Sequence, residues 1–186
     1  DASGCYVFAG GVDPHVHMHL PGAAGYSSDD FRSGGIAALS GGTTTLIDFV
    51  TPHRDQSLTE TLLLRMHEAA NSPLEYFFHV SPVRWRDELP LEIKACADMG
   101  IRSFKVYMAY KDTVGMDDGA IARVMKAVGR AGALVTIHCE LGDDIESRRK
   151  ALYDSGKTGP SSHPVSRPPE TESMAVKAAI AMAANA

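Results

Sequence analysis

Short runs of β-branched and aromatic residues alternate along the chain with stretches whose apolar residues recur at helical spacing. Runs of the first kind favour β-strands, and apolar positions three and four residues apart favour amphipathic helices. The pattern therefore predicts the order β-α-β-α-β-α-β-α-β, followed by a final helix. The predicted strands are 6–16, 43–50, 74–80, 102–108 and 133–138.

Helices are predicted between these strands and after the last one. Two of them span 28–39 and 87–99 and end at glycines, which are common just past the end of a helix. Asp117 or Asp118 is the predicted N-cap of another helix. The final helix is predicted over 172–186. The remaining apolar stripes are Leu62, Leu63, Met66, Ala69 and Ala70 in one helix, and Ile121, Val124, Met125 and Val128 in the other.

Strands that alternate with helices of this length imply right-handed βαβ units and a parallel sheet. Both an open doubly wound sheet and a (β/α)8 barrel fit this order. A barrel normally needs about 250 residues, and the fifth predicted strand ends at residue 138 of 186, with the chain ending inside an Ala-rich helix. We therefore expect one domain, residues 1–186, that is a partial TIM barrel of about five βα units and a fragment of a longer chain.

The composition is that of a folded domain and narrows the classes of partner. Lys and Arg number 18 against 23 Asp and Glu, a formal net charge of −5, and 44% of residues are hydrophobic. This mild acidity argues against nucleic acid or an anionic membrane as the main partner. No apolar run approaches the ~20 residues of a membrane-spanning helix. The three cysteines form no CxxC pair, which favours a reducing compartment, the cytoplasm.

Two histidines at the end of the first predicted strand are the first candidate for chemistry. His15 and His17 lie two positions apart in Gly-Gly-Val-Asp-Pro-His-Val-His (10–17), so both side chains point to one face of the sheet. In a barrel the carboxyl ends of the strands face the active site. Two imidazoles that converge there can bind one divalent metal. Taken alone, the motif fits a polar surface equally well, and His19 continues its spacing.

A lysine inside an apolar strand is the second candidate. Lys105 lies in Ser-Phe-Lys-Val-Tyr-Met (103–108), and strands of a parallel sheet are buried on both faces. Burial lowers the pKa of a lysine and makes the free amine available for covalent chemistry. Four roles are open: an ion pair with a buried carboxylate, a Schiff base, a carbamate formed with CO2, or a strand-end ammonium that reaches solvent.

His138, at the end of the fifth predicted strand, is the third candidate, on the same rim as the two histidines and the lysine. Four metal-competent groups at the ends of three strands are hard to assign to chance. His53 and His79 lie on this rim too, and we expect them to be structural. Cys139 has the opposite parity and is expected to pack. Glu140 begins the next loop, where it can cap or form a salt bridge.

These motifs together resemble the amidohydrolase superfamily, and within it the hydantoinases and dihydropyrimidinases. The matching stretches are collinear and cover nearly the whole chain. The resemblance implies a TIM-barrel, metal-dependent hydrolase. It would open the ring C–N bond of a hydantoin or dihydropyrimidine by means of a metal-bridging hydroxide. The matching stretches are 10–17, 29–31, 41–49, 103–112, 138–143 and 166–170.

The resemblance also implies roles for individual residues. His15 and His17 match the ligands of the more buried metal, and His138 matches a ligand of the second. Lys105 matches a carboxylated lysine that bridges both ions, and Tyr110 matches a tyrosine that orients the substrate carbonyl and supports the oxyanion. The implied cofactors are two divalent metal ions, usually Zn2+, with a CO2-derived carbamate on Lys105. The implied partners are a small cyclic amide and other copies of the chain, in a homotetramer.

Two further ligands of the family, a histidine on strand six and an aspartate on strand eight, have no counterpart in residues 1–186. We therefore expect these residues alone to be inactive. Other functions also fit the motifs. Allantoinases and dihydroorotases use the same metal cluster on other cyclic amides, and some dihydropyrimidinase-like proteins are non-catalytic scaffolds that have lost metal ligands. Retention of the two histidines, the lysine and the third histidine favours an enzyme.

Overall fold

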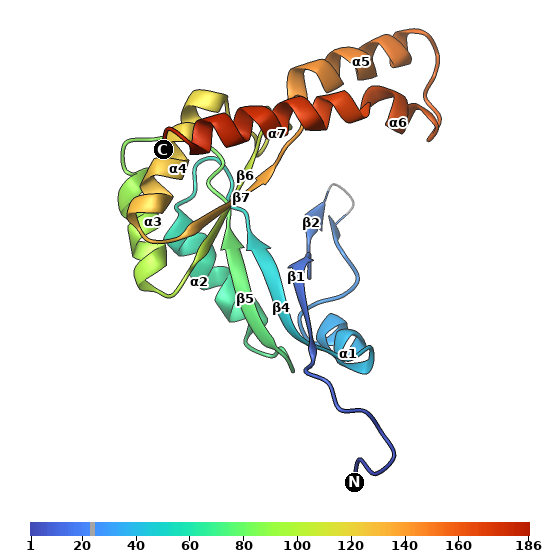
Figure 1. The fold of residues 1–186 in the computed structure, drawn as a ribbon, viewed down its shortest axis with the longest axis vertical. Coiled ribbons are helices and arrows are strands. Elements are labelled where there is room, and N and C mark those ends of the chain that lie inside the picture. The colour runs from blue at the N-terminus through green and yellow to red at the C-terminus, as the bar shows by residue number, and fades with distance from the viewer. Residues whose placement is uncertain (23–24) are drawn as a thin grey trace.

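In residues 1–22 and 25–186, which a computed structural model describes, five parallel strands form one curled sheet (Figure 1). Their order is β1-β4-β5-β6-β7, so each new strand joins beside the last one. This is the expected partial (β/α) barrel, and the open doubly wound sheet is excluded. The strands are β1 (Gly11–Val16), β4 (Thr43–Val50), β5 (Glu75–Val80), β6 (Ser103–Tyr107) and β7 (Leu134–His138); the short pair β2 (Pro21–Gly22) and β3 (Gly25–Tyr26) is antiparallel.

Helices connect the strands and cover the outer face of the sheet. In Figure 1, α2, α3 and α4 lie together on one side of the sheet, α5 and α6 project away from it, and α7 returns to pack against α4. No helix in the described ranges is both long and apolar enough to cross a membrane. The helices are α1 (Ser33–Ser40), α2 (Leu58–Ala69), α3 (Leu89–Asp98), α4 (Asp118–Arg130), α5 (Gly142–Asp154), α6 (Ser162–Ser166) and α7 (Pro169–Ala183).

The core lies between the outer helices and the sheet. Leu62 of α2, Ile93 of α3 and Val124 of α4 are fully buried, as are Val80 and Val106 of the strands. Burying each of these side chains contributes about 1.5–3 kcal/mol. The inner, concave face of the sheet is therefore not needed for the main core and is available for polar side chains.

Local hydrogen bonds explain where the helices begin. The Asp117 carboxylate accepts a hydrogen bond from the Ala120 amide at 2.8 Å, so Asp117, and not Asp118, is the N-cap of α4. Residues 28–32 were predicted to be helical, and this is wrong. The Asp30 carboxylate accepts from the amide of Ser33 at 2.7 Å, which holds a turn and delays α1 until Ser33.

Other predictions fail where tertiary contacts are missing. The first strand begins at Gly11, because residues 6–10 have no neighbouring strand and Tyr6 is 91% exposed. Leu63 and Met66 were assigned to a core stripe but lie on the exposed side of α2. Helix α5 was not predicted, because its sequence is highly charged and only two of its residues, Gly142 and Ile145, are buried.

Candidate metal centre

The sheet register places the two histidines of β1 on the inner face. Val16 pairs with Asp48 of β4, and paired residues on parallel strands share one face. His15 and His17 flank Val16 and therefore point to the opposite face, together with Phe49. Pro14 lacks an amide hydrogen, and the register of β1 shifts between Asp13 and Val16, a stretch that includes His15.

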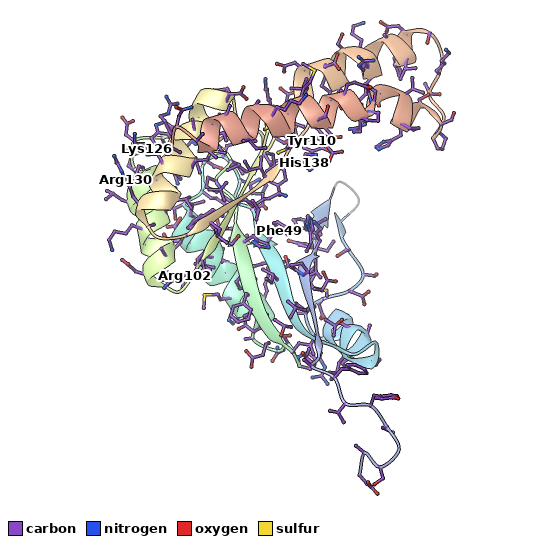
Figure 2. All side chains as sticks on the ribbon, viewed as in Figure 1. Phe49, Arg102, Tyr110, Lys126, Arg130 and His138 are labelled. Carbon is purple, nitrogen blue, oxygen red and sulfur yellow. The ribbon has the colours of Figure 1, made fainter. Side chains whose placement is uncertain are left out.

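The same register brings the lysine and the third histidine to this face. Phe49 pairs with His79 of β5, and Tyr107 of β6 pairs with His138 of β7. Lys105 lies two residues before Tyr107 and therefore shares its face. These inner positions lie toward the carboxyl ends of the strands, where Figure 2 labels Phe49 and His138. The expected grouping on one rim is thus present in the fold.

The ring of Phe49 forms the floor of this cluster. It is 6% exposed, and its centroid lies 4.6 Å from that of His15 and 4.8 Å from that of His17. The two imidazole rings are 5.2 Å apart. The Nζ atom of Lys105 lies 5.8 Å from the centre of the Phe49 ring. One aromatic side chain therefore contacts both histidines and faces the lysine amine.

Lys105 is buried without a compensating anion among the described residues. The residue is 7% exposed, and burial lowers the pKa of its amine. No described carboxylate opposes this effect; the only opposing contribution comes from Cys139. These facts disfavour the ion-pair role and the solvent-reaching role for Lys105. The lowered pKa makes the free amine, which is the reactive form of lysine, easier to reach than in an exposed lysine.

Both histidines of β1 are held toward their neutral form. Burial lowers the pKa of His15, and the positive charges of Lys105 and His17 lower it further. Burial also lowers the pKa of His17, against the opposing charge of Asp48. A neutral imidazole is the form that binds a metal ion. The environment therefore prepares these two side chains for ligation near neutral pH.

His138 is oriented by a carboxylate. Its Nε2 atom lies 2.7 Å from Glu140 Oε2, and the other Glu140 oxygen lies 3.6 Å from Nε of Arg167. This contact leaves Nδ1 of the His138 ring available for a ligand. The ring of Tyr110 lies 5.3 Å from the His138 ring and is 42% exposed (Figure 2). Tyr110 therefore lies next to His138 with its side chain partly open to solvent.

The remaining histidines of this region have other partners. His79 bridges β1 and β6, because one ring nitrogen lies 2.9 Å from the carbonyl oxygen of Pro14 and the other lies 2.7 Å from the Ser103 hydroxyl. With both nitrogens engaged, His79 is structural, as expected. His19 stacks on Tyr26 at 4.0 Å.

The donor set of this face fits a divalent metal only when Lys105 takes part. No three His, Cys, Asp or Glu side chains in residues 1–22 and 25–186 are placed to hold a metal ion together. Two imidazoles alone are fewer than the three or four protein ligands of a typical site. The buried amine of Lys105 beside them can become an anionic oxygen donor by reaction with CO2, which would complete such a set.

The comparison with protein families decides the broad class. The family model described as "Amidohydrolase family" matches residues 6–182. This chain belongs to the amidohydrolase family. The family suggested by the sequence motifs is thereby confirmed, and the (β/α) barrel is the fold expected of it.

Within this family, the chain is similar to hydantoinases and dihydropyrimidinases. The chain is 42% identical to a D-hydantoinase of Geobacillus stearothermophilus over 92% of its length, and 38% identical to a dihydropyrimidinase of Rattus norvegicus over 98%. A crystal structure of a D-hydantoinase matches 98% of the chain with a TM-score of 0.94 and 38% identity. The chain spans 37%, 36% and 40%, respectively, of the lengths of these relatives.

Sequence reasoning missed two residues that shape the cluster. Phe49 gave no chemical signal, because a phenylalanine in an apolar strand is ordinary; only the register reveals its place between the histidines. Asp48 did give a signal, since a carboxylate inside the run Thr-Thr-Thr-Leu-Ile-Asp-Phe-Val (43–50) is as unusual as the lysine in β6. It is fully buried and pairs with Arg65 of α2.

Proposed function

We propose that the full-length protein containing residues 1–186 is a metal-dependent hydrolase that opens the C–N bond of hydantoin or dihydropyrimidine rings. Residues 1–186 would then be part of one barrel domain of a longer chain. One observation carries the proposal: His15, His17 and the uncompensated amine of Lys105 gather around Phe49 at the carboxyl ends of the strands. The names of the similar proteins, D-hydantoinase and dihydropyrimidinase, support the choice of substrate class.

The ligands follow from this cluster. We infer that His15, His17 and a carbamate on Lys105 would hold one divalent ion, and that the carbamate and His138 would hold a second. Zn2+ suits such imidazole and carboxylate-like donors. Bound metal ions would supply Lewis acidity, which lowers the pKa of a water molecule and polarises a carbonyl group.

The chain's own residues would bind and orient the substrate. The Tyr110 hydroxyl would donate a hydrogen bond to the ring carbonyl oxygen and stabilise the negative charge that builds up there. The Phe49 ring contacts both imidazoles of β1 and would cover them on that side. The product would be a ring-opened N-carbamoyl amino acid or ureido acid.

We also propose a cytoplasmic homotetramer. The three cysteines are free thiols, as suits a reducing compartment. The arm formed by α5 and α6 projects from the barrel (Figure 1) and carries two exposed apolar side chains, Tyr153 at 73% and Val165 at 58%. Such side chains on a projecting arm favour contact with another subunit.

The activity is tested on the full-length protein, purified with and without added zinc. We expect opening of hydantoin or dihydrouracil, detected as the ureido acid, and its loss after treatment with a chelator. Allantoin and dihydroorotate are the comparison substrates. If allantoin or dihydroorotate is opened faster than hydantoin and dihydrouracil, the protein is an allantoinase or a dihydroorotase instead. A folded, zinc-loaded protein that opens none of the four rings would support the scaffold alternative instead.

The contact of Glu140 with His138 leads to a separate prediction. We expect Glu140→Gln in the full-length protein to weaken zinc binding by about 10- to 100-fold, as is usual when the carboxylate that orients a ligating histidine is lost. Zinc affinity is measured by competition with a chelating dye. Glu146→Gln is the matched control, because Glu146 pairs with Arg149 on the exposed side of α5. Equal zinc affinity of Glu140→Gln and the wild type would contradict the orienting role.

A further inference from the structure

Arg54 joins two loops at the carboxyl end of the sheet. It lies in the loop between β4 and α2, and its guanidinium donates to three backbone carbonyl groups of the loop after β6. Nη2 lies 2.6 Å from the carbonyl oxygen of Lys111 and 3.2 Å from that of Gly115, and Nε lies 3.0 Å from that of Thr113. These carbonyl groups belong to residues 111–115, which follow Tyr110. Tyr110 is the residue that we propose contacts the substrate carbonyl.

The loop that Arg54 holds is tightly wound. Tyr110 has a φ of 60°, in the left-handed region that residues other than glycine disfavour. Its carbonyl oxygen accepts hydrogen bonds from the amides of Thr113, Val114 and Gly115 at 2.8–3.1 Å. A Cβ atom on Gly115 would lie 2.0 Å from the carbonyl oxygen of Ala109, so only glycine fits there. A backbone held in this conformation needs support from outside the loop.

The geometry of an arginine suits this task. Its planar guanidinium presents donors in a rigid fork, and here two of its nitrogens reach three carbonyls that the wound loop turns outward. A lysine at the same position has one nitrogen and cannot reproduce the fork. The contact therefore links the conformation of Tyr110 to a side chain that lies more than fifty residues earlier in the chain.

We propose that Arg54 is a positioning residue, which holds Tyr110 in place for its contact with the substrate carbonyl by tying residues 111–115 to the β4–α2 loop. The inference rests on the proposed function for the role of Tyr110. The tie, meaning the contact of Arg54 with residues 111–115, rests only on the three hydrogen bonds and on the left-handed backbone of Tyr110.

The kinetic test uses the full-length, zinc-loaded protein. We expect Arg54→Ala to lower kcat/KM for the ring amide by about 10- to 100-fold, the usual effect of a misplaced catalytic contact. Arg54→Lys should give an intermediate value. Arg102→Ala is the matched control: Arg102 is also exposed and donates to two backbone carbonyls, of Ala97 and Ile101, at the far end of β6 (Figure 2). It should leave kcat/KM unchanged.

A double-mutant cycle separates positioning from a general structural effect. In a Tyr110→Phe background, where the hydroxyl is absent, Arg54→Ala should have little further effect on kcat/KM. If the double variant instead loses kcat/KM by the product of the two single losses, Arg54 does not act through Tyr110, and the proposal is wrong.

A readout that needs no activity tests the tie directly. Trypsin cleaves after Lys111, inside the tied loop, and we expect Arg54→Ala and Arg54→Lys to be cut there faster than the wild type or Arg102→Ala. If the wild type opens no cyclic amide, the proposed function fails while this cleavage still tests the tie. Equal cleavage rates would overturn the tie, and faster cleavage with unchanged kcat/KM would overturn the positioning of Tyr110.

Discussion

Lys105→Ala in the full-length protein is expected to remove both the bound metal and the hydrolysis of cyclic amides. Lys105 is 7% exposed, and no described carboxylate balances a charge on it. The variant lacks the anionic ligand that we propose both ions share. Zinc lowers the pKa of a bound water molecule far below that of free water, and this activation is lost with the metal, so kcat/KM should fall by more than about a thousandfold.

Zinc content per chain and kcat/KM for dihydrouracil measure this effect. Acetate added with excess zinc should restore part of the activity by supplying a carboxylate in the vacated space. Lys126→Ala, which removes an exposed lysine of α4 (Figure 2), is the control and should change neither quantity. Lys105→Met refills the space and separates loss of the amine from loss of packing. Normal zinc content and activity in Lys105→Ala would refute the carbamate role.

Asp48→Ala should cause the largest loss of stability. Asp48 is fully buried; it accepts hydrogen bonds from the amides of Met18 at 2.7 Å and Phe49 at 2.5 Å, and it pairs with Arg65 at 2.9 Å. The variant leaves the Met18 amide without its acceptor, and Arg65 keeps only its ion pair with Glu68, whose side chain is 40% exposed. The free energy of unfolding should therefore fall by about 3–5 kcal/mol.

Urea unfolding of the full-length protein measures this loss. Asp98→Ala is the matched control, because Asp98 pairs with Lys94 at 2.6 Å with both side chains more than 60% exposed. Breaking an exposed pair should cost less than about 1 kcal/mol. Met18 directly follows His17, so Asp48→Ala should also weaken zinc binding. A loss of stability no greater than that of Asp98→Ala would contradict the anchoring role of Asp48.

The strands could be predicted well because their signal is local. Strand β4 spans Thr43–Val50, as predicted, and β5, β6 and β7 begin and end within one residue of their predicted bounds. Each is a run of β-branched and aromatic residues with glycines or polar residues outside its ends, and the pattern of a doubly buried strand needs no long-range information. Parity along a single strand likewise suffices to place His15 and His17 on one face.

Elements that depend on distant partners could not be predicted in this way. The exposed residues 6–10 have strand-like side chains, yet no strand pairs with them. Helix α5 has few apolar residues, and ion pairs one turn apart, such as Arg148 with Asp144 and Lys150 with Asp154, support it instead.

The sequence by itself determined the order of the five parallel strands and of the helices that connect them, the amidohydrolase motifs and the identity of the candidate ligands. Only the tertiary structure decided that Phe49 lies against both histidines, that Glu140 orients His138 and that Arg54 reaches the loop of Tyr110. The physical reason is that composition and periodicity act over a few neighbouring residues. Contacts between strands depend instead on register, and contacts between loops depend on where the sheet brings their ends together.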